Sequence, residues 1–112
     1  MLSEPIIAYA HEGDLSAIIG GMVYRGEAIP GLRSGYVFGD WGRGNGHLFA
    51  AYPPIIGSGL WEITEIQVEI EIGQLLGIGE DESGELYLLT KAPGMGAVGN
   101  SGMLYKIIAR SQ

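Results

Sequence analysis

The sequence of 112 residues contains no cysteine, few basic residues and no long apolar run. The lack of cysteine excludes disulfides, thiolate metal sites and cysteine nucleophiles. Six Lys and Arg residues against 13 Asp and Glu residues give a formal net charge of −7, which opposes binding to nucleic acid or to an anionic membrane. No stretch approaches the roughly 20 apolar residues of a membrane span, and Met1 to Pro5 lack the character of a signal peptide.

Glycine and apolar residues are abundant instead. The sequence has 20 glycines and is 46% hydrophobic, which is too apolar for disorder and too glycine-rich for a helical bundle. We expect one domain over residues 1–112, because a chain of this length buries roughly two thirds of the surface that it exposes when unfolded. The composition predicts an all-β domain with many turns.

β-Branched and aromatic runs recur along the chain between Gly, Pro, Asn, Asp and Ser residues, a spacing typical of antiparallel meanders. About eight strands are predicted on this basis. They lie near Ile6 to His11, Ala17 to Arg25, Gly35 to Asp40, His47 to Tyr52, Trp61 to Ile72, Leu75 to Gly79, Glu85 to Lys91 and Met103 to Ala109.

Two patterns predict how these strands are covered. From Glu65 to Ile72, apolar residues alternate with acidic or amide residues, which predicts a strand with one buried face and one wet face. The nearly continuous apolar runs Leu86 to Leu89 and Tyr105 to Ile108 instead predict strands that are covered on both faces. Gly94 to Gly102 is expected to form a loop.

Three glycine-rich segments together resemble a known family. They are Gly20 to Gly26, Gly35 to Asp40 and Gly79 to Tyr87, in this order along the chain. The order resembles the C-terminal part of the glucose/sorbosone dehydrogenase family, and the resemblance extends from Pro5 to Ile108. It implies part of a six-bladed β-propeller and a periplasmic or secreted location.

The resemblance also implies a chemistry. Members of the family oxidise sugars with pyrroloquinoline quinone and calcium, so these cofactors are implied here by resemblance alone. The family's catalytic base, a histidine in an early blade, has no counterpart in this sequence. Gln74 and Leu76 stand where arginines grip the quinone. The chain is therefore not expected to oxidise sugars by itself.

The strand count has a consequence for assembly. Eight strands at four per blade form about two propeller-like blades, each an antiparallel four-stranded meander, which are too few to close a propeller. Exposed edges and apolar blade faces promote association. A homo-oligomer is thus expected, with a trimer that supplies all six blades favoured and a dimer as the alternative. A small β-sandwich or barrel is the alternative fold.

The acidic segment Glu80 to Glu85 contains the candidate metal ligands, Asp81 and Glu80. Clustered carboxylate oxygens are the ligands that a hard cation such as calcium prefers. The segment lacks the alternating spacing of a calcium loop, however, and a hairpin turn with Gly84 at positive φ explains the same residues. Both interpretations stay open.

Five residues are candidates for binding a ligand, namely Trp41, Arg43, His11, Arg25 and Asp40. Trp41 directly precedes a glycine-rich loop, and an aromatic ring in such a place is suited to stack on a small carbohydrate. His11 is alternatively a residue that caps a loop, and Arg25 and Asp40 are alternatively scaffold residues that fix neighbouring strands.

Three functions are compatible with these observations. The first is a partial sugar dehydrogenase-like propeller module that binds a small carbohydrate. The second is a segment of a quinone-dependent sugar oxidoreductase that other chains complete. The third is a structural or interaction module.

Overall fold

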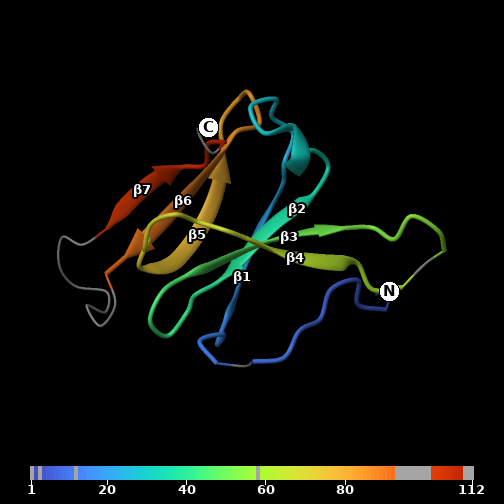
Figure 1. Cartoon of the computed structure of the whole chain (residues 1–112), viewed down its shortest axis with the longest axis horizontal. Coiled ribbons are helices and arrows are strands. Elements are labelled where there is room, and N and C mark those ends of the chain that lie inside the picture. The colour runs from blue at the N-terminus through green and yellow to red at the C-terminus, as the bar shows by residue number, and fades with distance from the viewer. Residues whose placement is uncertain (1, 3, 12, 58, 93–101, 110–112) are drawn as a thin grey trace.

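The computed structural model describes the chain except residues 1, 3, 12, 58, 93–101 and 110–112. Seven strands in this part of the chain form two antiparallel sheets (Figure 1). The first sheet contains, in chain order, β1 (Ile18–Val23), β2 (Tyr36–Asp40), β3 (His47–Tyr52) and β4 (Glu62–Ile66). The second contains β5 (Gln74–Glu80), β6 (Leu86–Lys91) and β7 (Met103–Lys106). A 3-10 turn, η1 (Pro30–Leu32), lies between β1 and β2.

Both sheets are meanders, because every strand pairs with the strand that precedes or follows it in the sequence. The two sheets meet where β1 lies against β5, and neither sheet closes into a barrel. The prediction of an all-β fold built from antiparallel meanders is therefore confirmed. That residues 1–112 form a single domain equivalent to about two blades stays a prediction.

The core lies between the two sheets. Successive strand residues point to opposite faces, so Val37 of β2 and Leu48 of β3 face the second sheet, from which Leu75, Leu86 and Leu88 face back. All five side chains are at most 3% exposed. Burial of each such side chain contributes roughly 1.5–3 kcal/mol, so this contact is what holds the sheets together.

The opposite face of the first sheet is covered by the N-terminal segment. Phe38 and Phe49 stack with their ring centroids 5.4 Å apart, and Ile7 and Tyr9 pack on them. Residues 6–11 were expected to form a strand, but they form none, because they run across this aromatic face instead of along a sheet edge. One backbone hydrogen bond, from the Trp61 N–H to the Ile6 carbonyl, joins this segment to the chain near β4.

The segment Glu65 to Ile72, which was expected to form one strand, differs from that expectation. Its strand ends at Ile66, and residues 67–73 leave the first sheet and cross to the start of β5 (Figure 1). The crossing ends at Gly73, whose φ of +80° favours glycine. Alternation in this segment therefore serves an inter-sheet connection, in which Ile72 is buried while Val68 and Ile70 are exposed.

The second sheet is covered on one face only. Leu86 and Leu88 of β6 are buried, but Leu89 is 48% exposed and its partner on β7, Leu104, is 69% exposed. The expectation that Leu86 to Leu89 and Tyr105 to Ile108 are covered on both faces is thus wrong within this chain. The predicted loop Gly94 to Gly102 lies outside the described residues apart from Gly102.

A buried carboxylate ties the loop after β1 to the hairpin between β5 and β6. Glu85 accepts a hydrogen bond of 2.7 Å from the Tyr24 hydroxyl and two more from the N–H groups of Glu27 and Ala28. The Tyr24 hydroxyl in turn accepts one from the Ile29 N–H. These hydrogen bonds, with that of Tyr24 first in effect, hold the pKa of Glu85 below its ordinary value. The loop therefore connects the two sheets through polar contacts as well as apolar ones.

Tyr24→Phe should lower the free energy of unfolding by about 1–3 kcal/mol, because it leaves the Oε1 atom of Glu85 and the Ile29 N–H without a partner. Urea denaturation followed by tryptophan fluorescence measures the change. Tyr52→Phe is the matched control, since the Tyr52 hydroxyl forms an exposed hydrogen bond with the Gly31 carbonyl and its loss should cost less than about 1 kcal/mol. Equal losses in the two variants would contradict the role given to Tyr24.

Candidate functional site

An apolar groove of about 410 Å³ opens between the two sheets on the side of β4 and β7. Leu48, Ile66 and Leu88, which also belong to or pack against the core, contribute to its lining. Its remaining lining residues come from the β4–β5 crossing and from the C-terminal part of the chain, namely Gln67, Val68, Glu69, Ile70, Ile72, Tyr105, Lys106, Ile107, Ile108 and Ala109. The groove is thus an extension of the inter-sheet core to the surface.

The β4–β5 crossing gives this groove its chemical character. Ile66, Val68, Ile70 and Ile72 alternate with more polar residues and all line the groove. Glu69 and Glu71, between and beside them, are exposed. The groove therefore combines an apolar interior with the charged residues Glu69 and Lys106 in its lining.

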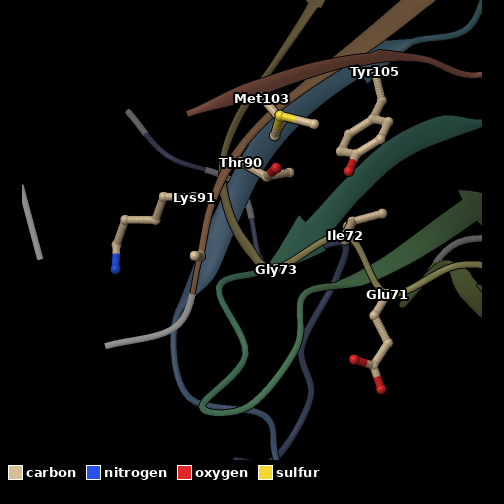
Figure 2. A pocket seen from close by; sticks show the side chains of 8 residues that line it. Glu71, Ile72, Gly73, Thr90, Lys91, Met103 and Tyr105 are labelled. Carbon is tan, nitrogen blue, oxygen red and sulfur yellow. The ribbon is translucent and has the colours of Figure 1, made fainter. Parts of the chain in front are cut away.

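A smaller pocket of about 250 Å³ lies at the start of β5 (Figure 2). Ile72, Thr90, Met103 and Tyr105 line it, and Figure 2 shows the side chains of Glu71 and Lys91 extending away from these four. The Lys91 ammonium donates a hydrogen bond of 2.7 Å to the Gln74 side chain instead. The side chains of Glu71 and Lys91 are thus directed away from the four residues that line the pocket.

Asp40, a candidate ligand residue, lies at the end of β2 and is fully buried. Its carboxylate accepts hydrogen bonds from the Tyr9 hydroxyl at 2.6 Å and from the N–H groups of Ser16, Ala17 and Gly42. Burial raises the pKa of Asp40, but these hydrogen bonds outweigh it and hold the pKa below its ordinary value. The geometry supports the scaffold alternative, since all four donors belong to the protein itself.

Asp40→Ala should lower the free energy of unfolding by about 3 kcal/mol or more, because it leaves the Tyr9 hydroxyl and three N–H groups unpaired. Asp40→Asn keeps one oxygen acceptor and should lose less. Thermal melts of the three proteins measure the order. A melting temperature that stays unchanged in Asp40→Ala would favour the ligand role over the scaffold role.

His47 bridges two carboxylates at the start of β3. Its two ring nitrogens lie 3.1 Å from a carboxylate oxygen of Asp14 and 3.1 Å from one of Glu65. Partial burial lowers the pKa of His47, but the hydrogen bonds to Glu65 and Asp14 outweigh it and raise the pKa above its ordinary value. Only the protonated ring donates to both carboxylates, so protonation strengthens the link between the N-terminal segment, β3 and β4.

Stability should therefore fall as the pH rises. The contribution of His47 is complete below its unfolded pKa of about 6.5 and is lost as the pH passes through the raised pKa of the folded state. Urea titrations at pH 6 and pH 8 should differ by about 0.5–1 kcal/mol, a size typical of partly exposed ion pairs. His47→Gln should remove this difference, whereas His11→Gln should retain it. A difference that survives in His47→Gln would assign the effect to another group.

The other candidate ligand residues are placed apart. Trp41 and Arg43 follow Asp40 directly, and the Lys91 ammonium lies 5.8 Å from the centroid of the Trp41 ring. His11 is exposed and contacts the Tyr9 ring edge-on. Arg25 forms an ion pair of 2.7 Å with Glu80 at the far end of β5. The structure thus brings Asp40, Trp41 and Arg43 together and places Arg25 elsewhere, and the ligand role of all five stays a prediction.

The two candidate metal ligands of the acidic turn, Asp81 and Glu80, form contacts within the protein. Asp81 accepts hydrogen bonds from the N–H groups of Ser83 and Glu85 and from the Tyr87 hydroxyl. One oxygen of Glu80 is held by Arg25, and Gly84 adopts a φ of +81°, as the hairpin interpretation expects. Within the described ranges, no group of three or more His, Asp or Glu side chains is arranged to hold a metal ion. A metal role for Asp81 and Glu80 stays a prediction.

Sequence reasoning missed Tyr9, Tyr24 and Glu85 as the partners of the two buried carboxylate networks. The only signal was the position of a tyrosine or an acid within an otherwise apolar or glycine-rich segment. It also missed the groove, because Ile66 to Ile72 were assigned to a strand. None of the described residues belongs to a helix with the length and apolar character that crossing a membrane requires.

Two open antiparallel sheets with an apolar groove between them define a β-rich module. No protein-family model matches the chain. It is similar to the human and mouse proteins named Hedgehog-interacting protein, with 33% identity over 113 aligned positions in each case. The alignment covers 95% of this chain and 15% of either relative, so the similarity is to a segment of a much longer protein.

These comparisons correct the family assignment made from the sequence. The glucose/sorbosone dehydrogenase family was expected, but no family model matches, and the chain is instead similar to Hedgehog-interacting proteins. Sugar oxidation, pyrroloquinoline quinone and calcium were attached to that resemblance and lose their support with it. Glycine-rich strand starts such as Gly35 to Asp40 misled the assignment, because the turns and close strand contacts of many β folds require them.

Proposed function

We propose that this chain is a protein-interaction module that associates with polypeptides through apolar surfaces of its second sheet. The observation that carries the proposal is the outward face of that sheet. Leu89 and Leu104 are cross-strand partners that point away from the core, and Leu76 is exposed beside them at the irregularity between Leu75 and Gly77. An exposed apolar face of this kind marks an interaction surface.

Glycines make this face flat. Gly77 pairs with Leu89, and Gly79 pairs with Tyr87, on the same strand ladder. No atom lies within 4 Å of the position that a Cβ would occupy at either glycine. A flat sheet face without side chains at these positions allows another sheet or strand to approach closely.

The similarity to Hedgehog-interacting protein supports the same proposal, since the name of that protein describes binding to another protein. A Hedgehog protein is therefore the first partner to test. A second copy of this chain is the other, because the sequence predicts a homo-oligomer.

The structure bears on which oligomer is favoured. The outer face of the first sheet is occupied by the N-terminal segment, in which Ile7 and Tyr9 pack on Phe38 and Phe49. A ring of three copies would need the outer faces of both sheets, whereas a two-fold pair needs only that of the second sheet. The dimer is thus favoured over the trimer, and either state stays a prediction.

Sedimentation velocity tests the proposal on the chain alone and mixed with a purified Hedgehog protein, at tens of micromolar. The chain should form a species heavier than its monomer of 11.9 kDa or a complex with the Hedgehog protein. Leu89→Lys combined with Leu104→Lys should abolish it, since each lysine places a charge on the apolar face.

The matched control is Ile55→Lys combined with Ile56→Lys in the β3–β4 loop, where both side chains are almost fully exposed. This variant changes the net charge and the exposed apolar area in the same sense but leaves the second sheet intact, so it should associate like the parent chain. A chain that sediments as a monomer in both samples would overturn the proposal.

A further inference from the structure

The smaller pocket at the start of β5 contains a buried hydroxyl that has no partner within the described part of the protein. Thr90 is fully buried, and its Oγ1 atom forms no hydrogen bond with any described group. Ser16 and Glu80 each carry one other buried polar atom of this kind, but neither residue lines either of the two pockets. Because a buried hydroxyl without a partner is costly, Thr90 points to a polar group that enters the pocket from outside.

The strand register places this hydroxyl in the wall of the pocket. Thr90 of β6 pairs with Met103 of β7, and both lie on the face of the second sheet that is turned toward the first sheet. Tyr105, two positions further along β7, packs against the core on the same face. Figure 2 shows the Thr90 side chain directed toward that of Tyr105. The hydroxyl therefore belongs to the pocket and not to the outer face, where Leu89 and Leu104 lie.

The rest of the lining favours an aromatic ring of modest size. Ile72 and Tyr105 contribute aliphatic and aromatic surface, and Met103, which is 53% exposed, contributes its thioether. Methionine sulfur and tyrosine rings both pack favourably on another aromatic ring. The volume of about 250 Å³ lies below the roughly 300–1,000 Å³ of most small-molecule pockets, so the space suits one side chain better than a whole metabolite.

Of the aromatic side chains, tyrosine meets both requirements of the pocket. Its ring would pack on Met103 and Tyr105, and its hydroxyl would either donate to Thr90 or accept from it. Phenylalanine would leave the Thr90 hydroxyl unpaired, and tryptophan has a larger ring system whose single N–H only donates. Tyrosine is also among the residues that most often anchor an interface by entering a pocket of the partner.

We propose that this pocket receives a tyrosine side chain of the partner polypeptide, whose hydroxyl pairs with Thr90 Oγ1 while its ring packs on Met103 and Tyr105. The inference rests on the proposed function and names an anchor residue that the partner supplies. Recognition at this pocket takes place on the inner face of the second sheet, so it adds to the contact made by the outward face of the same sheet.

NMR titration tests the proposal on the whole chain, with N-acetyltyrosine amide as the probe and N-acetylphenylalanine amide as its counterpart without the hydroxyl. The tyrosine probe should shift the resonances of Thr90, Met103 and Tyr105. It should bind about threefold to tenfold more tightly than the phenylalanine probe, the size expected of one hydrogen bond. Equal affinities of the two probes, or no shift at these residues, would overturn the proposal. Glucose should leave the same resonances unchanged, and a shift by glucose would assign the pocket to carbohydrate instead.

Thr90→Val separates the contribution of the hydroxyl from that of the pocket's shape. It should weaken binding of the tyrosine probe by about threefold or more and leave binding of the phenylalanine probe unchanged. Thr64→Val is the matched control, since Thr64 is exposed on β4 and lines neither pocket, and this variant should retain the preference for tyrosine. Met103→Ala should weaken both probes, because it removes a contact with the ring. A preference for tyrosine that survives in Thr90→Val would contradict the assigned hydrogen bond.

Thermal melts of the same variant check the state of the hydroxyl in the free protein. Thr90→Val should keep or raise the melting temperature, because it removes a buried hydroxyl that pairs with no described group. A clear decrease in the melting temperature would mean that a group of the protein already pairs with the hydroxyl, and the inference would then be lost.

The two proposals fail in distinguishable ways. Leu89→Lys combined with Leu104→Lys should lose association but still bind the tyrosine probe, because both leucines lie on the opposite face of the sheet. If the parent chain associates in sedimentation but does not bind the probe, only the inference about the pocket is lost. If the chain neither associates nor binds the probe, the proposed function is lost as well.

Discussion

The buried carboxylate of Asp40 is the interaction on which the accessible surfaces of this protein depend. Its hydrogen bonds to the Tyr9 hydroxyl and to the N–H groups of Ser16 and Ala17 fix the N-terminal segment across the first sheet. A buried carboxylate without such partners would cost several kcal/mol, so the segment and the carboxylate require each other. Because this face is covered, the outward face of the second sheet and the groove are the apolar surfaces of the two sheets that stay accessible.

Glu85 is a second buried carboxylate whose hydrogen bonds hold a loop in place. Like Asp40, it accepts a hydrogen bond from one tyrosine hydroxyl, that of Tyr24, and hydrogen bonds from two N–H groups of a loop. In both places an acidic side chain accepts hydrogen bonds from the N–H groups of backbone that forms no strand. A protein rich in loops and glycines needs such acceptors, because buried N–H groups must be paired. The negative charge of the chain is thus partly structural, while Glu71 on the β4–β5 crossing is exposed.

The sequence predicted the fold where local patterns decide it, and failed where distant contacts do. β2, β3 and β6 lie close to their predicted positions, because β-branched and aromatic residues there are bounded by glycine-rich turns. Residues 6–11 have the composition of a strand, but Tyr9 is drawn onto the aromatic face by Asp40, 31 positions away. Residues 67–72 alternate like a strand, but they must cross between sheets. No local pattern distinguishes these outcomes, and the groove is a result of the second one.

The unequal covering of the two sheets is itself an argument for a partner. The N-terminal segment covers the outer face of the first sheet, whereas Leu89 and Leu104 on the outer face of the second sheet are exposed and β7 is one of its edge strands. Natural sheets normally protect such edges with charge, proline or a covering segment, and here Lys106 is the only charged residue on β7. Lys106 lies 5.9 Å from the centroid of the Tyr87 ring on the outer face, where it leaves the backbone of the edge open. Among the described residues, no strand pairs with this edge of β7.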